Sequence, residues 1–270
     1  MTADDPTLPE AFFVPDGGLF VGTEATAGPW DPHSMHFGPP AALLGRAVEA
    51  QPAATARRVV RTTFEILRPV PVGPVRVRAE VRRSGGRVDL VSAVLTSVEG
   101  TELALCRAWR IREAEIDVPA GGMAAGVAPP SAPGDGDVTG FFAVATDAHY
   151  GTAMDTRFVT GGFTEPGPSD VWMRMRIPLV AGEDPSPLTR VLVAADSGNG
   201  VSAVDDPRTL LFINPDLTVH LHRHPTGTWI RMQARTVIDG LGSGLAVSTL
   251  GDADGAIGMA LQSLFVDEQP

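Results

Sequence analysis

The chain has 270 residues, of which 43% are apolar, and a formal net charge of −11. This apolar fraction suffices for a packed core, and the length suits one large domain or two modest ones. No stretch approaches the roughly 18 uninterrupted apolar residues of a membrane span. The acidic balance argues against general nucleic-acid binding, which needs a basic face. Residues 1–6 lack the basic and apolar parts of a secretion signal, so we expect a cytoplasmic protein.

The first half of the chain predicts one helix followed by four strands. A strand-like segment at 18–26 precedes Pro39 and Pro40, which open a helix because their missing N–H groups cost nothing there. Leu43, Leu44 and Val48 form the apolar face of this helix. Strand signals then follow at 59–67, 75–82, 88–96 and 102–111.

The single cysteine, Cys106, lies in the last of these alternating segments. One cysteine excludes an internal disulfide and any cysteine metal cluster. We therefore expect Cys106 to be a small buried residue rather than a nucleophile.

A stretch rich in Gly, Ala and Pro, residues 119–137, has no periodicity and is typical of a linker. It divides the chain into halves of similar size. The sequence therefore predicts an N-terminal domain over 1–117, a linker over 118–140 and a C-terminal domain over 141–270.

The second half has the same layout as the first. An alternating strand is predicted at 171–177, and a helical region at 190–203 carries Asp196. Strands are predicted at 218–223, 229–237, 245–250 and 256–266. Helices that do not alternate with the strands favour an α+β fold over a parallel sheet.

A constant offset of 155 residues relates the two halves. The offset matches the end of one strand with the end of its counterpart, and it also matches turn glycines with one another. Matched turn glycines are informative because they supply special backbone angles. The matched pairs are Arg68 with Arg223, Gly85 with Gly240, and Gly100 with Gly255. The chain is therefore predicted to contain two copies of one α+β unit.

Short motifs in a shared order carry a family resemblance. They are His36-Phe-Gly-Pro-Pro, Phe64-Glu-Ile-Leu-Arg-Pro, Ala195-Asp-Ser-Gly-Asn-Gly, Asn214-Pro-Asp-Leu-Thr and Gln262 within Met259-Ala-Leu-Gln-Ser. With them, the chain resembles the acyl-CoA thioesterase II-like proteins. The resemblance implies a double hot-dog fold, in which two antiparallel sheets each wrap around a central helix.

The resemblance also implies an active site. In the family an Asp, a Thr and a Gln hold the attacking water; they match Asp196, Asn214 and Gln262, so Asn replaces Thr here. An amide can still donate to or accept from a water. The implied reaction is hydrolysis of an acyl-CoA or acyl-carrier thioester without a cofactor, and a homodimer is a further expectation.

Three more residues are assigned to substrate binding. His36 precedes the start of the first helix, and Gly38 and Gly198 are small enough to let a substrate approach backbone N–H groups. The offset of 155 assigns Arg107 as the counterpart of Gln262. The first half therefore does not repeat the chemistry of the second, and we expect one active site per chain.

Two alternative functions remain open. Asp31 and His36 show the Asp-x-x-x-x-His spacing of hot-dog enoyl-CoA hydratases, without the Asn-Pro of that motif. Asn214 in place of Thr is also consistent with a protein that binds acyl groups without catalysis.

Two clusters suggest ligands but have simpler explanations. His220, His222 and His224 have no nearby acid or cysteine to complete a metal site, so we predict a strand face and no metal. The arginines at 57, 58 and 61 suit either coenzyme A phosphates or a solvated strand edge.

Overall fold

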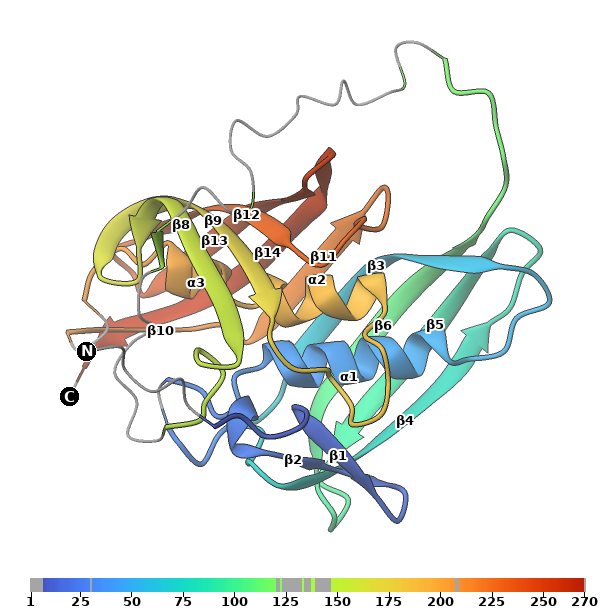
Figure 1. Ribbon diagram of the computed structural model, residues 1–270, viewed down its shortest axis with the longest axis horizontal. Coiled ribbons are helices and arrows are strands. Elements are labelled where there is room, and N and C mark those ends of the chain that lie inside the picture. Colours follow the sequence, from blue (N-terminus) through green and yellow to red (C-terminus); the bar gives the residue numbers. More distant parts are fainter. Residues whose placement is uncertain are drawn as a thin grey trace.

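The structure, a computed structural model, describes residues 7–29, 31–119, 147–206 and 209–269, together with 122, 133 and 137–138. Most of the predicted linker therefore lies outside the described residues. Within the described part, one antiparallel sheet of 14 strands curves around two adjacent helices, α1 and α2 (Figure 1). No described helix is long and apolar enough to cross a membrane.

The described part of the first half contains one α-helix and six strands. They are β1 (Phe13–Asp16), β2 (Leu19–Gly22), α1 (Gly38–Glu49), β3 (Arg57–Ile66), β4 (Pro74–Arg83), β5 (Val88–Thr96) and β6 (Glu102–Arg112). A short 3₁₀ helix at Glu24–Thr26 replaces the end of the strand predicted at 18–26. The predicted α1 and the four strands after it are confirmed.

The second half is less regular. Its elements are β7 (Asp137–Val138), β8 (Met154–Gly162), β9 (Glu165–Met175), α2 (Pro187–Ala195), α3 (Gly198–Val201), β10 (Leu210–Ile213), β11 (Asp216–Leu221), β12 (Ile230–Ile238), β13 (Ser243–Asp252) and β14 (Gly255–Glu268). Strand β8 was not predicted, and its pairing with β9 shifts register after Phe158 and again after Thr160. The helical region predicted at 190–203 is present, but it begins at Pro187 and is divided into two helices at Asp196 and Ser197.

The two halves meet where β3 pairs with β11. The expected two separate sheets are joined here into one, since each strand would otherwise leave an unpaired edge. Thr63 lies opposite Thr218, with their hydroxyl oxygens 3.4 Å apart. Because 63 + 155 = 218, these two residues are each other's counterparts, and the repeat is centred on them.

The offset changes by one residue in the last strand of each half. Thr63 faces Arg107 in β6, whereas Thr218 faces Leu261 in β14, which gives an offset of 154. Five residues separate Thr96 from its partner Glu102 in the β5–β6 hairpin, and four separate the equivalent pair, Gly251 and Ala256, in the β13–β14 hairpin. The predicted match of Gln262 with Arg107 is therefore wrong: the counterpart of Gln262 is Ala108.

The core lies between the sheet and the two helices. Leu43 and Leu44 of α1 and Leu188 and Leu192 of α2 are almost fully buried. A side chain at Gly45 would collide with Leu192, so this glycine sets the close approach of the helices. Cys106, also buried in this core, is confirmed as a buried residue, and its burial raises the pKa of its thiol.

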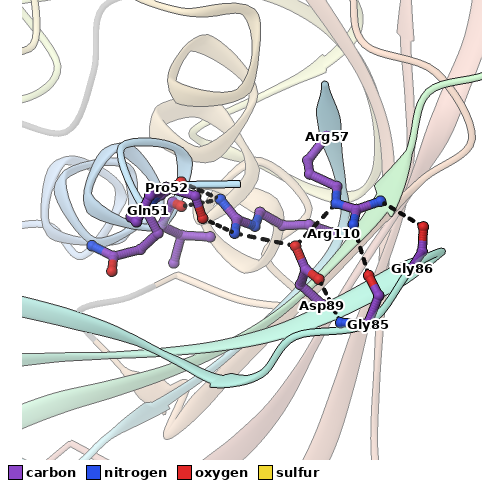
Figure 2. A network of polar contacts seen from close by, with 8 residues as sticks. Gln51, Pro52, Arg57, Gly85, Gly86, Asp89 and Arg110 are labelled. Carbon is purple, nitrogen blue, oxygen red and sulfur yellow. Dashed lines mark hydrogen bonds and ion pairs between the residues drawn. The ribbon is translucent and has the colours of Figure 1, made fainter. Parts of the chain in front are cut away.

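A buried ionic network fixes the end of α1 to the sheet (Figure 2). Arg110 on β6 donates to the backbone carbonyl of Gln51, just beyond α1, at 2.7 Å and to Asp89 on β5 at 3.3 Å. Asp89 also accepts from Arg57 at 3.0 Å and from the backbone N–H of Gly85 at 3.0 Å. The side chain of Arg57 therefore forms its hydrogen bonds inside the first half.

Replacing Arg110 with methionine tests this network. Arg110→Met keeps most of the apolar stem but leaves helix-end carbonyls and part of the Asp89 charge without a donor. We expect the free energy of unfolding to fall by about 3 kcal/mol, measured by urea denaturation. Arg58→Met is the control, because Arg58 pairs with Glu113 at the surface and should contribute less than about 1 kcal/mol. Equal losses in the two variants would contradict a structural role for the network.

Candidate active site

Asp196 lies where the two helices meet. Asp196 is the C-cap residue of α2, and only 4% of its surface is exposed. The backbone N–H groups of Phe37 and Gly38, at the start of α1, lie near its carboxylate and act to lower its pKa. The positive end of the α1 dipole therefore faces a buried acid from the other half of the chain.

Two amide side chains hold one oxygen of this carboxylate. Asn214, in the turn between β10 and β11, donates from Nδ2 to Oδ1 of Asp196 at 2.9 Å. Gln262, on the inner face of β14, donates from Nε2 to the same Oδ1 at 3.2 Å and to the Asp196 backbone carbonyl at 3.0 Å. Gln262 is itself held by the backbone N–H of Asn199, which donates to Oε1 at 3.0 Å. The structure thus brings the three residues expected to be catalytic within hydrogen-bonding distance.

His36 approaches the other oxygen of Asp196. Its Nδ1 lies 3.3 Å from Oδ2 and also accepts the backbone N–H of Gly38 at 3.1 Å. The imidazole stacks on Tyr150 with ring centroids 3.7 Å apart and planes 4° from parallel. The structure therefore places His36 against the acid. The sequence predicted that His36 binds substrate, and that role stays a prediction.

Burial shifts the titration of both groups. Burial raises the pKa of Asp196 to about 7, although Asn214, Gln262 and the two helix N–H groups act to lower it. Burial lowers the pKa of His36 to about 3, so the imidazole is neutral at physiological pH. Asp196 therefore exchanges its proton near neutrality, as a general base requires.

The two glycines of the predicted site are required by the protein's own packing. A side chain at Gly38 would collide with the backbone carbonyl of Val193 in α2. A Cβ at Gly198 would lie 2.8 Å from Oε1 of Gln262 and 2.8 Å from the hydroxyl of Ser248. Both glycines let the site assemble; a contact with substrate stays a prediction.

Tyr150 was missed by the sequence analysis. Its hydroxyl donates to the carbonyl of Val193 at 2.8 Å and shares a hydrogen bond with Ser197 at 2.9 Å, so it fixes the end of α2. A signal was present, since His149-Tyr-Gly repeats the order His36-Phe-Gly. In each turn the histidine Nδ1 accepts the glycine N–H at 3.1 Å.

Other candidate residues lie elsewhere. Asp31 accepts from the backbone N–H of His33 and from the hydroxyl of Ser34, so the structure does not pair it with His36 as a hydratase dyad would require. His220 is exposed, whereas His224 contacts the carbonyl of Val59 at 2.8 Å. Among the described residues, no group of three metal-ligating side chains gathers.

Comparison with known sequences identifies the family. The acyl-CoA thioesterase N-terminal domain matches residues 26–111, and the acyl-CoA thioesterase C-terminal domain matches residues 125–266. The chain belongs to the acyl-CoA thioesterase family. No curated protein matches this family member significantly.

Solved structures establish its fold. A Thermobifida fusca protein described as a thioesterase II candidate is 18% identical, with a TM-score of 0.72 over 94% of this chain and 95% of that one. An acyl-CoA thioesterase II from Mycobacterium marinum is 17% identical, with a TM-score of 0.65 over 94% and 95%. A hot-dog protein of unknown function from Alicyclobacillus acidocaldarius is 17% identical, with a TM-score of 0.68 over 96% of each chain. This thioesterase family member therefore has the hot-dog fold.

The raised pKa of Asp196 predicts a cost in stability. The folded state holds this proton more tightly than the unfolded chain does, so the contribution is full at low pH and is lost as pH rises toward and through about 7. Asp196→Asn removes the titration and keeps the shape. The free energy of unfolding of the variant minus that of the parent should be larger at pH 8 than at pH 5, by about 3 kcal/mol. Urea denaturation at both pH values measures this, and a pH-independent difference would contradict the raised pKa.

Proposed function

We propose that the protein hydrolyses acyl-CoA or acyl-carrier thioesters with a water activated by Asp196. The observation that carries this proposal is the buried Asp196 carboxylate, which has a pKa of about 7 and is held by Asn214 and Gln262 at the start of α1. Family membership supports the thioester class of substrate.

In the proposed reaction, Asp196 accepts a proton as the water oxygen attacks the thioester carbonyl carbon. The carbonyl electron pair moves to oxygen, then returns as the carbon–sulfur bond breaks with its electrons on sulfur. The proton on Asp196 then neutralises the thiolate, and a carboxylic acid and a thiol result. Asn214 and Gln262 fix the carboxylate, so little reorganisation accompanies proton transfer.

One such site per chain follows from the divergence of the halves. The counterpart of Gln262 is Ala108, which is fully buried and cannot hydrogen-bond through its side chain. The proposed division into domains over 1–117 and 141–270 then gives two structural copies with one reaction centre. That centre takes His36 and the α1 N–H groups from the first copy, and the acid and both amides from the second.

A two-channel assay tests the function. The protein is incubated with saturated and enoyl thioesters of coenzyme A, and free thiol and the enoyl chromophore are followed together. We expect thiol release, with kcat/KM lowered roughly 10³-fold in Asp196→Asn because the general base is lost. Asp31→Asn is the matched control and should stay within about twofold, since, among the described residues, that carboxylate hydrogen-bonds within its own turn, to His33 and Ser34. Loss of chromophore without thiol would indicate hydration instead, and silence in both channels would indicate binding alone.

The pH dependence follows from the same acid. Only ionised Asp196 accepts a proton, so kcat/KM should rise with pH and level off above a midpoint near 7. At one pH unit below the midpoint the value should be about a tenth of the plateau, measured by initial rates with the uncatalysed hydrolysis subtracted. A profile that is flat between pH 5.5 and 8 would exclude Asp196 as the rate-determining base.

A further inference from the structure

We propose that His36 is a positioning residue, which holds the proton of the general base between its Nδ1 and Oδ2 of Asp196. This inference rests on the proposed thioesterase function and adds a fourth side chain to the site. Its basis is the contact between these two atoms at 3.3 Å, together with the hydrogen bonds that already occupy each partner.

The His36 ring has little freedom to turn away. Tyr150 stacks against it at 3.7 Å, and the Tyr150 hydroxyl is fixed by Val193 and Ser197 at the end of α2. Both rings are buried, and burial raises the pKa of the Tyr150 phenol, so the ring below His36 is uncharged. The same helix end that carries Asp196 therefore also fixes the ring that holds His36 in place.

The hydrogen bonds assign the proton on the imidazole. Nδ1 accepts the Gly38 N–H at 3.1 Å, so a neutral His36 carries its hydrogen on Nε2. Two acceptor atoms, Nδ1 and Oδ2, then face each other at 3.3 Å. Such a contact is unfavourable while the carboxylate is ionised, and it becomes a hydrogen bond once Oδ2 carries a proton.

The two oxygens of Asp196 are therefore not equivalent. Oδ1 accepts from both amides, Asn214 at 2.9 Å and Gln262 at 3.2 Å, and a proton there would break those bonds. Oδ2 faces an acceptor, so it is the oxygen that takes the proton from water. His36 thus stabilises the protonated form and keeps Asp196 a stronger base than the amides and helix N–H groups alone would allow.

During hydrolysis the proton would stay inside this pair. It leaves the water as the carbon–oxygen bond forms, binds Oδ2, and is hydrogen-bonded to Nδ1 until the carbon–sulfur bond breaks. It then passes to the thiolate, which regenerates the ionised base. Tyr150 is the further titratable side chain that the described contacts bring to the pair, and it remains neutral throughout.

The variant His36→Phe tests the inference, because phenylalanine preserves the stack on Tyr150 and removes Nδ1. We expect the midpoint of the kcat/KM profile to move about one pH unit lower, and the plateau to fall roughly tenfold because the base is weaker. The control is His149→Phe, which removes the equivalent Nδ1–glycine bond from the other turn. It should leave the midpoint unchanged. An unchanged midpoint in His36→Phe, with the parent enzyme active, would overturn the inference and leave the proposed function standing.

A second measurement needs neither activity nor a variant of His36. Nitrogen-15 NMR of the histidine side chains distinguishes the Nε2–H tautomer, the Nδ1–H tautomer and the imidazolium. We expect His36 to remain the Nε2–H tautomer from pH 5 to 8, with an Nδ1 shift that moves as Asp196 titrates and stops moving in Asp196→Asn. An imidazolium, or the Nδ1–H tautomer, in that range would overturn the inference. An inactive parent enzyme with the expected spectrum would instead refute the proposed function alone.

Discussion

The burial of one carboxylate at the junction of two helices is the constraint on which the site depends. An isolated carboxylate in an apolar interior is strongly disfavoured, so it must be hydrogen-bonded or protonated. Asp196 satisfies this requirement through partners from α1, from β14 and from the turn after β10. Each partner belongs to a different part of the chain. The complete fold is therefore needed to keep the buried carboxylate hydrogen-bonded.

The same constraint explains the local irregularities around Asp196. Helix α2 ends at this residue instead of continuing into α3, which frees the backbone carbonyl of Asp196 to accept from Gln262. Gly38 allows α1 to approach Val193 closely enough for its first N–H groups to reach the carboxylate. A regular helix through Asp196 would engage this carbonyl, and a larger residue at Gly38 would collide with Val193 and move α1 away from the acid.

The sequence predicted the parts of the fold that local physics controls. Alternating strands such as β4, the apolar face of α1 and the turn glycines were visible because periodicity and backbone angles are local properties. The one-residue change that makes Ala108 the counterpart of Gln262 was not visible in the sequence. It depends on how the two strands of each hairpin pair and where their register shifts. Tyr150 was missed for a similar reason. Its role arises only when the second half folds against His36 of the first.

For the site, the sequence indicated which residues meet but not how they are bonded. Asp196, Asn214 and Gln262 came from a resemblance, and their contacts are now seen at hydrogen-bonding distances. The contact of Asp196 with His36 joins residues 160 positions apart, and no periodicity could predict it. Burial of the pair, which controls both pKa values, likewise depends on the assembled helices and sheet.

Asparagine at position 214 acquires a physical meaning in this arrangement. A threonine hydroxyl both donates and accepts, so it could share a proton with either carboxylate oxygen. The Asn214 Nδ2 group only donates, and it is aligned by the carbonyl of Asp216, which it also contacts at 3.2 Å. With Gln262 it therefore keeps Oδ1 in the acceptor role, which leaves Oδ2 as the proposed site of protonation. Because Oδ2 faces His36, Asn214 and His36 would act together in the proposed mechanism to direct the proton to a single oxygen.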